Sequence, residues 1–152
     1  MNCDHVRLGE ISSDITKTEP TIRFSNMVSF DLSAIKQSDF NTSFNPQPFG
    51  LTAENACQMM WYSGLSNNCN SVGIYGYYPE LDGRGNGADV IAIMAWYFIE
   101  GFYHRKEQNF KSKDFKKFNV DVDGENLVFY KDVRNEMWWV EIEESKNIEI
   151  KQ

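Results

Sequence analysis

The sequence predicts an α/β fold with a mainly parallel sheet, followed by short antiparallel strands near the C-terminus. Two apolar runs, 27–33 and 71–77, are strand candidates separated by a helical segment. Strand, helix and strand in this order, with a connection of this length, form a right-handed βαβ unit with a parallel strand pair. Two later strand candidates, 126–130 and 137–142, follow a hairpin-type turn signal at Asp123-Gly124.

Length and composition predict one globular domain over residues 1–152. A chain of 152 residues can bury one core but is too short for two comfortable domains. Its 41% hydrophobic and 14% aromatic content excludes a disordered chain. The charged segment 143–152 is expected to fray at the end of the domain.

Charge and cysteine usage limit the class of partner and the compartment. The formal net charge of -7 and the pI near 4.8 argue against nucleic-acid binding, which needs a basic face. Three cysteines, Cys3, Cys57 and Cys69, form neither a CxxC pair nor an even disulfide set, as expected for reduced thiols. The longest apolar stretch, 90–99, is too short to cross a bilayer. We expect a cytoplasmic protein with small-molecule ligands and no nucleic-acid or membrane partner.

Local signals define the N-terminal elements. Residues 6–8, Val-Arg-Leu, are interpreted as a short strand. Pro20 stands at a first helical position, with Ile22 and Phe24 available for burial, so 19–24 is predicted to be a short helix.

The run 27–33 is the segment around which the rest is organised. Apolar residues alternate at Val28, Phe30 and Leu32, as in a buried strand, and Asp31 stands just before the end of the run. Open α/β folds place their chemistry at such strand ends. Asp31 is therefore a candidate functional carboxylate, and the structural alternative is an acid that caps or hydrogen-bonds at the strand end.

A long loop and then a helix are predicted after this strand. Asn45-Pro46 and Pro48 prevent a helix from continuing through 39–50. Thr52 is expected to be an N-cap, because its hydroxyl can accept a hydrogen bond from a free amide of the first turn. Apolar residues at helical spacing then lead to Gly64, which is predicted to form the left-handed helix stop.

A second helix, 88–104, is predicted after the turn-rich stretch 81–87. Its buried stripe is expected to contain Ile91, Met94 or Ala95, Phe98 and Phe102. The lysines between 111 and 117 are interpreted as a solvated face. In the Trp138-Trp139 pair one ring is expected in the core and the other outside it, because successive strand residues point to opposite faces.

Three further patterns resemble functional motifs but are interpreted as structural. Asp121-Val122-Asp123 mimics a DxD metal pair, yet it lies in a hydrophilic run and is predicted to be a turn. The glycines at 83, 85 and 87 do not match the GxGxxG phosphate-binding pattern. His5 and His104 have no HxxxH partner and no acidic cluster beside them, so neither is expected to bind a metal.

The segment Ser29-Phe30-Asp31-Leu32-Ser33 resembles the Ser-Φ-Asp-Φ-Asp signature (Φ, apolar) of the arginase, agmatinase and formimidoylglutamase family, the ureohydrolases. In that family both acids hold a binuclear Mn²⁺ centre. The resemblance implies that Asp31 is a metal ligand, whereas Ser33 replaces the second acid. Asp39, a few residues further on, is an alternative source of the missing acid, but it matches no position of the family pattern.

Other segments resemble the family in the same order. Phe49-Gly50-Leu51-Thr52 is similar to a helix start whose threonine lies near the substrate, which implies a substrate-binding role for Thr52. Residues 72–79 resemble a strand that ends in a glutamate, two residues and a proline; Gly76 replaces that glutamate, which holds the guanidinium group in arginases. The segments similar to the bacterial formimidoylglutamase or arginase-like subgroup are 31–34, 96–101 and 138–139.

The resemblance implies the C-terminal half of a three-layer α-β-α, arginase-like fold. Complete members hydrolyse C–N bonds in linear amidines such as formiminoglutamate, arginine or agmatine, and take most Mn²⁺ ligands from a His and an Asp-x-His-x-Asp motif in their N-terminal half. Neither motif occurs in this sequence. We therefore expect no catalytic residue and no hydrolase activity in the isolated chain, with an amidine substrate only if an N-terminal half completes it. The alternative is a non-catalytic remnant that acts as an interaction or assembly module.

Part of a parallel sheet leaves a strand edge unpaired and a helix-facing surface exposed. The sequence therefore also predicts self-association into a homo-oligomer through that edge.

Overall fold

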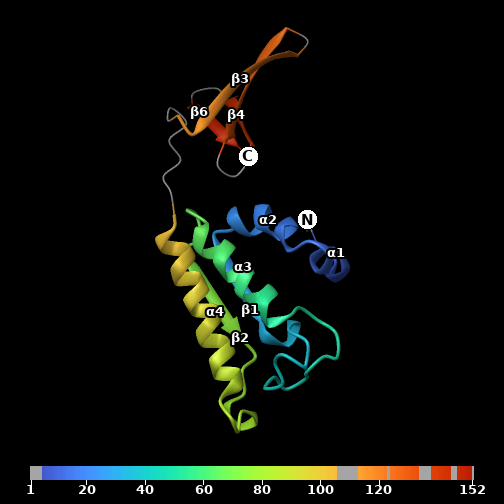
Figure 1. The fold of residues 1–152 in the computed structure, drawn as a ribbon. Coiled ribbons are helices and arrows are strands. Elements are labelled where there is room, and N and C mark those ends of the chain that lie inside the picture. Colours follow the sequence, from blue (N-terminus) through green and yellow to red (C-terminus); the bar gives the residue numbers. More distant parts are fainter. Residues whose placement is uncertain (1–4, 106–112, 123, 134–137, 145–146, 152) are drawn as a thin grey trace. The chain divides into compact units, whose positions relative to one another are not determined.

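The computed structural model describes residues 5–105, 113–122, 124–133, 138–144 and 147–151. The chain divides into two compact units, Met1–Lys106 and Glu107–Gln152 (Figure 1). The four strands of the second unit pair with one another, which makes this unit a sheet in its own right. Where the sequence predicted a single domain over 1–152, the structure has two units.

Short helices begin the first unit. Helix α1 spans Leu8–Ser13, the 3-10 helix η1 spans Ile15–Thr18 and helix α2 spans Glu19–Arg23. The strand predicted at 6–8 is wrong: Arg7 is the N-cap of α1, and its amide donates to the Glu10 carboxylate at 3.1 Å. The helix predicted at 19–24 is confirmed, with proline in its first turn.

The predicted parallel pair is confirmed. Strand β1, Met27–Asp31, pairs in parallel with β2, Ser71–Tyr75, in a register that sets Asp31 beside Tyr75. β1 ends two residues earlier than predicted, because residues Leu32–Ala34 form the 3-10 helix η2. The two carboxyl ends therefore lie together at one edge of the sheet.

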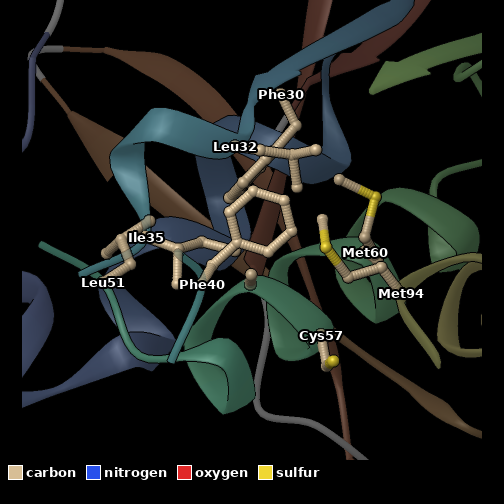
Figure 2. Packing of buried hydrophobic residues seen from close by; sticks show 9 residues of the cluster. Phe30, Leu32, Ile35, Phe40, Leu51, Cys57, Met60 and Met94 are labelled. Carbon is tan, nitrogen blue, oxygen red and sulfur yellow. The ribbon is translucent and has the colours of Figure 1, made fainter. Parts of the chain in front are cut away.

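Helix α3 spans Ala53–Leu65 and helix α4 spans Asn86–Tyr103, close to the predicted ranges. These helices contribute Ala56, Cys57, Met60 and Met94 to the core of this unit, and the segment 30–51 contributes the other buried residues of the cluster. Met60 of α3 and Met94 of α4 are fully buried against Phe30 of β1 (Figure 2). The predicted stripe of α4 is only partly correct, because Phe102 is 47% exposed.

One face of the strand pair is open in the described part of the chain. Val28 and Phe30 point into the core with the helices, whereas Met27 and Ser29 alternate with them and are exposed. The exposed ring of Tyr75 folds back over Gly73, at the place where a side chain on Gly73 would lie. The described segments thus form helices on one face of the pair, and the third layer expected from the resemblance is not seen in them.

Helices α3 and α4 approach each other closely at two glycines. A Cβ atom on Gly101 would lie 2.5 Å from the Trp61 carbonyl oxygen, and one on Gly64 would overlap the Phe98 carbonyl oxygen. Gly64 does not form the predicted left-handed stop, since α3 continues to Leu65 and positive φ occurs at other glycines. Its function is to let the two backbones meet.

The second unit is an antiparallel meander. Its strands are β3, Phe115–Val122, β4, Glu125–Asp132, β5, Trp138–Glu144, and β6, Asn147–Lys151, in the order β3-β4-β5-β6. The two predicted strands correspond to β4 and β5. Of the lysines interpreted as a solvated face, Lys116 and Lys117 lie in β3, Lys113 is exposed in the turn before β3, and Lys111 lies outside the described residues. Strand β6 forms within the segment expected to fray.

Turn and tryptophan predictions in this unit hold. Gly124 has a φ of 87° and its amide donates to the Asp121 carboxylate at 3.1 Å, so the Asp121 side chain belongs to the hairpin between β3 and β4, and Asp123 lies outside the described residues. Trp139 is buried against Phe115, whereas Trp138 on the opposite face is 44% exposed. None of the helices in the described segments combines the length and hydropathy that a bilayer crossing requires.

The glycine contact between α3 and α4 gives a test in which the same substitution, glycine to alanine, has opposite effects on the free energy of unfolding at two positions. We expect Gly101→Ala to lower the free energy of unfolding by about 1–3 kcal/mol, because the new methyl group meets the α3 backbone. Gly9→Ala in α1, where a Cβ atom has open space, should instead stabilise by about 0.5–1 kcal/mol. Urea unfolding of both variants measures this, and equal effects would contradict the close approach.

Candidate functional site

The candidate site is the edge of the sheet where β1 and β2 end. Asp31 is the last residue of β1, and Gly76 follows the end of β2 directly beside it. The loops after both strands, 32–52 and 76–85, therefore begin at the same edge (Figure 1). Ligands of open α/β folds bind outside the carboxyl ends of the strands, which makes this edge the natural place for a site.

The Asp31 carboxylate is exposed and serves as a local cap. Its Oδ1 accepts a hydrogen bond of 2.9 Å from the Ser33 amide, which begins the η2 turn. The structural alternative from the sequence is thus present in the molecule. The cap also fixes the orientation of the carboxylate at the sheet edge. This geometry is therefore compatible both with a capping role and with a functional role for Asp31.

Gly76 makes a tight turn against Asp31. Its φ is +85°, in the left-handed region that favours glycine, and a Cβ atom on it would lie 3.0 Å from Asp31 Oδ1. The residue at the position where the ureohydrolase pattern has a glutamate is therefore held in a backbone conformation that a residue with a side chain adopts only with strain. The side chain of a glutamate at position 76 would leave the backbone next to the Asp31 carboxylate.

Thr52 forms the N-cap that the sequence predicted. Its hydroxyl accepts a hydrogen bond of 3.0 Å from the Asn55 amide, and the Asn55 side chain accepts from the Thr52 amide at 3.1 Å. This reciprocal capping box satisfies two backbone amides at the start of α3. The substrate-binding role implied for Thr52 by the resemblance stays a prediction.

Asp39 is tied to the start of α3. Its carboxylate accepts from the Ala53 amide at 3.2 Å and forms an ion pair with Lys36 at 3.3 Å. Burial raises the pKa of the Asp39 carboxyl, but the hydrogen bonds from Ser38, Ala53 and Lys36 and the lysine charge together outweigh it, so the pKa lies below its ordinary value. These contacts explain Asp39 as a structural anchor of the loop.

Asp82 is a polar residue of this region that sequence reasoning missed. Its Oδ2 accepts hydrogen bonds from the Tyr77 hydroxyl at 3.0 Å and from the Ala88 amide in the first turn of α4 at 2.9 Å. Burial raises its carboxyl pKa, but hydrogen bonds from Ala88, Gly87 and Tyr77 outweigh this, so the pKa falls below its usual range. No capping-box spacing signals this residue, because the turn 83–85 separates it from the helix.

The donor set of the described residues does not fit a binuclear metal centre. No group of three or more His, Cys, Asp or Glu side chains that could hold a metal ion occurs within these segments. His104 Nδ1 lies 2.8 Å from the Glu100 carbonyl oxygen and its ring packs on Trp61, in keeping with the expected structural role. Asp31 is thus a single carboxylate, and a pair of Mn²⁺ ions needs more ligands than that.

Comparison with solved structures identifies the fold. The chain is similar to Trypanosoma cruzi formiminoglutamase with Mn²⁺, at 23% identity and a TM-score of 0.60, covering 65% of this chain and 35% of that chain. It is similar to Bacillus subtilis formimidoylglutamase at 17% identity and a TM-score of 0.63, covering 70% and 36%. It is similar to Bacillus caldovelox arginase at 20% identity and a TM-score of 0.54, covering 68% of this chain and 36% of that chain. No protein-family model and no curated protein matches the sequence.

These similarities confirm the resemblance at the level of fold. The three structures are all arginase-like proteins, and the chain spans about a third of each of them. The matched share of this chain, 65–70%, is close to the size of the first unit, Met1–Lys106. The mixed fold of this unit, with its small parallel sheet, agrees with part of an arginase-like domain.

The turn at Gly76 predicts that a glutamate at this position destabilises the chain. We expect Gly76→Glu to lower the free energy of unfolding by about 1–2 kcal/mol, because positive φ strains a residue with a side chain. Gly83→Glu is the matched control, since a Cβ atom there has open space. Thermal unfolding at neutral pH compares the two, and a neutral Gly76→Glu would show that this turn adapts.

The lowered pKa of Asp39 predicts a pH-dependent contribution to stability. A carboxyl whose folded-state pKa is depressed stabilises the fold above its unfolded pKa, about 3.9, and loses this as pH falls through the folded pKa. We expect Asp39→Asn to be less stable than the parent at pH 7, with the difference shrinking below about pH 4. Urea unfolding across this range tests it, with Glu80→Gln on the surface as control; a constant difference would contradict the assignment.

Proposed function

We propose that this chain forms the C-terminal part of an arginase-like metallohydrolase that cleaves C–N bonds in linear amidines. The observation that carries the proposal is the parallel β1–β2 pair, with Asp31 at its carboxyl end, in a fold shared with formiminoglutamases. Formiminoglutamate, arginine and agmatine are the candidate substrates. The chain spans about a third of these relatives, so the remaining fold comes from further polypeptide.

A groove beside β2 supports this completion. It is apolar, has a volume of about 260 Å³ and is lined by side chains of α3, β2 and α4 that include Met60, Val72, Ile74 and Phe98. β2 itself contains no charged residue, whereas strands that stay at a sheet edge are commonly protected by charges. An added strand along β2 would cover both the groove and the strand edge.

In the completed protein, Asp31 is the proposed Mn²⁺ ligand from this chain and Thr52 the proposed residue near the substrate. The Ser33 amide already orients the Asp31 carboxylate at the sheet edge. Bound Mn²⁺ would supply a Lewis acid and an activated water. Because one carboxylate does not hold a metal pair, the isolated chain is proposed to be inactive.

A non-catalytic interaction or assembly module is the second candidate. Gly76, in place of the guanidinium-binding glutamate of arginases, removes a contact that arginine-like substrates need. Ser33, in place of the second acid, removes a ligand. Both replacements favour this candidate over an arginine-specific hydrolase, and Gly76 is the stronger argument of the two, because Ser33 also belongs to the pattern of the formimidoylglutamase-like subgroup.

The first test is activity of the isolated chain with added Mn²⁺. Residues 1–152 should release no formamide from formiminoglutamate and no urea from arginine or agmatine above background. The Mn²⁺ electron paramagnetic resonance signal should show no stoichiometric binding. Turnover by the chain alone would overturn the proposed need for further polypeptide.

The second test places the chain in a complete fold. Residues 1–106 replace the corresponding segment of Bacillus subtilis formimidoylglutamase, and Mn²⁺ content of the folded chimera is measured. We expect Asp31→Asn to lose Mn²⁺ and Asp89→Asn, on the exposed surface of α4, to retain it. A folded chimera whose metal content ignores Asp31, or that binds none, would favour the non-catalytic candidate.

A further inference from the structure

Two aromatic rings meet where the loops that follow β1 and β2 come together. Phe44 belongs to the loop 32–52 and Tyr78 to the loop 76–85, and their ring centroids lie 5.8 Å apart with the planes tilted by 42°. Phe44 is 79% exposed, so this contact leaves most of its ring open to solvent. Single exposed apolar residues are ordinary, whereas a ring pair that joins two loops at the carboxyl edge of a sheet is a candidate for ligand contact.

The ring pair is held in place by Thr42. The Thr42 carbonyl oxygen accepts a hydrogen bond of 3.0 Å from the Tyr78 amide, which ties the first loop to the second. The Thr42 side chain is buried against Gly87 in the first turn of α4, where a Cβ atom would overlap the Thr42 hydroxyl oxygen. A ligand that stacks on Phe44 and Tyr78 therefore does not have to order the two loops, which favours binding.

The ring pair lies close to the carboxylate at the sheet edge. A Cβ atom on Gly76 would lie 3.0 Å from Asp31 Oδ1. Tyr78 follows Gly76 by two residues, and two residues of extended chain span at most about 7 Å. Tyr78 and Asp31 therefore belong to one region of the edge, while Gly76 between them has no side chain to offer a ligand.

The charges of this edge favour a cation. Strand β1 ends in Asp31, and the loop 76–85 carries Glu80 and Asp82 against Arg84. The loop after β1 adds no net charge, because its lysine and its aspartate form an ion pair with each other. An excess of carboxylates raises the local concentration of cations and repels anions.

We propose that Phe44 and Tyr78 form a platform on which the planar amidinium cation of a substrate stacks, beside Asp31. Aromatic rings attract cations through the negative charge of their faces, and a planar, delocalised cation also stacks on the ring. This inference rests on the proposed function for its ligand class, since amidines are protonated to such cations. The platform adds a recognition element that contains no metal ligand, so it can be tested without Mn²⁺.

The test uses the full chain without metal and two small probes. Acetamidinium is a linear amidine cation with a methyl group, and acetamide is its neutral isostere. In NMR titrations the acetamidinium methyl signal should move upfield as the cation stacks on the rings, and acetamide should show no such shift. Tyr78→Leu and Phe44→Leu should each weaken acetamidinium binding by roughly two- to fivefold, the equivalent of one exposed cation–π contact. Tyr78→Phe keeps the ring and should retain the parent affinity.

Phe49→Leu is the matched control. Phe49 lies in the same loop as Phe44 and is 83% exposed, so its loss should leave acetamidinium binding unchanged. Because Phe44 lies largely outside the core, Phe44→Leu tests the platform even if Tyr78→Leu fails to fold. No methyl shift with the parent chain, an equal shift with acetamide, or an equal loss in Phe49→Leu would overturn the platform.

The Mn²⁺ content of the chimera described above separates this inference from the proposed function. A chimera that binds Mn²⁺ through Asp31, together with a parent chain that does not bind acetamidinium, would overturn the platform alone. Ring-dependent acetamidinium binding together with a metal-free chimera would support the platform and count against the metallohydrolase.

Discussion

The close approach of α3 and α4 is the contact on which the rest of the first unit depends. Gly64 and Gly101 let the two helix backbones meet, and this holds Met60 and Met94 as one apolar surface under Phe30. That surface supports the parallel β1–β2 pair, whose register sets Asp31 beside the turn at Gly76. The geometry of the candidate site is therefore set by a helix contact that contains none of its residues.

Three carboxylates around this sheet edge act in the same way, as acceptors for backbone amides. Asp31 caps η2, Asp39 anchors the start of α3 and Asp82 anchors the start of α4. Helix starts and turns leave amides without partners, and a carboxylate satisfies them well. Each of these carboxylates is thus held by a backbone amide of its own loop or helix. This explains why the described residues do not bring the three acids together as a metal centre.

The sequence was sufficient where a local pattern determined the structure and insufficient where a distant contact did. Strand spacing predicted the parallel pair, and the Thr52 hydroxyl predicted the start of α3. Gly64 was misread as a helix stop, because its function depends on contact with α4, a helix much later in the chain. Strand β3 was missed because its lysines outweighed the alternation of Phe118, Val120 and Val122, and Asp82 because a turn separates it from the helix it caps.

The two units also differ in what their topology requires of a folding chain. The meander β3-β4-β5-β6 joins strands that are neighbours in sequence, so each pairing closes only a short loop. The β1–β2 pair joins residues as distant as Met27 and Ser71, and the whole of α3 lies between them. Chain entropy opposes this second closure more strongly, and folding slows as contacts become less local. The C-terminal sheet can thus form first, while the edge that carries Asp31 takes shape only after its crossover helix has docked.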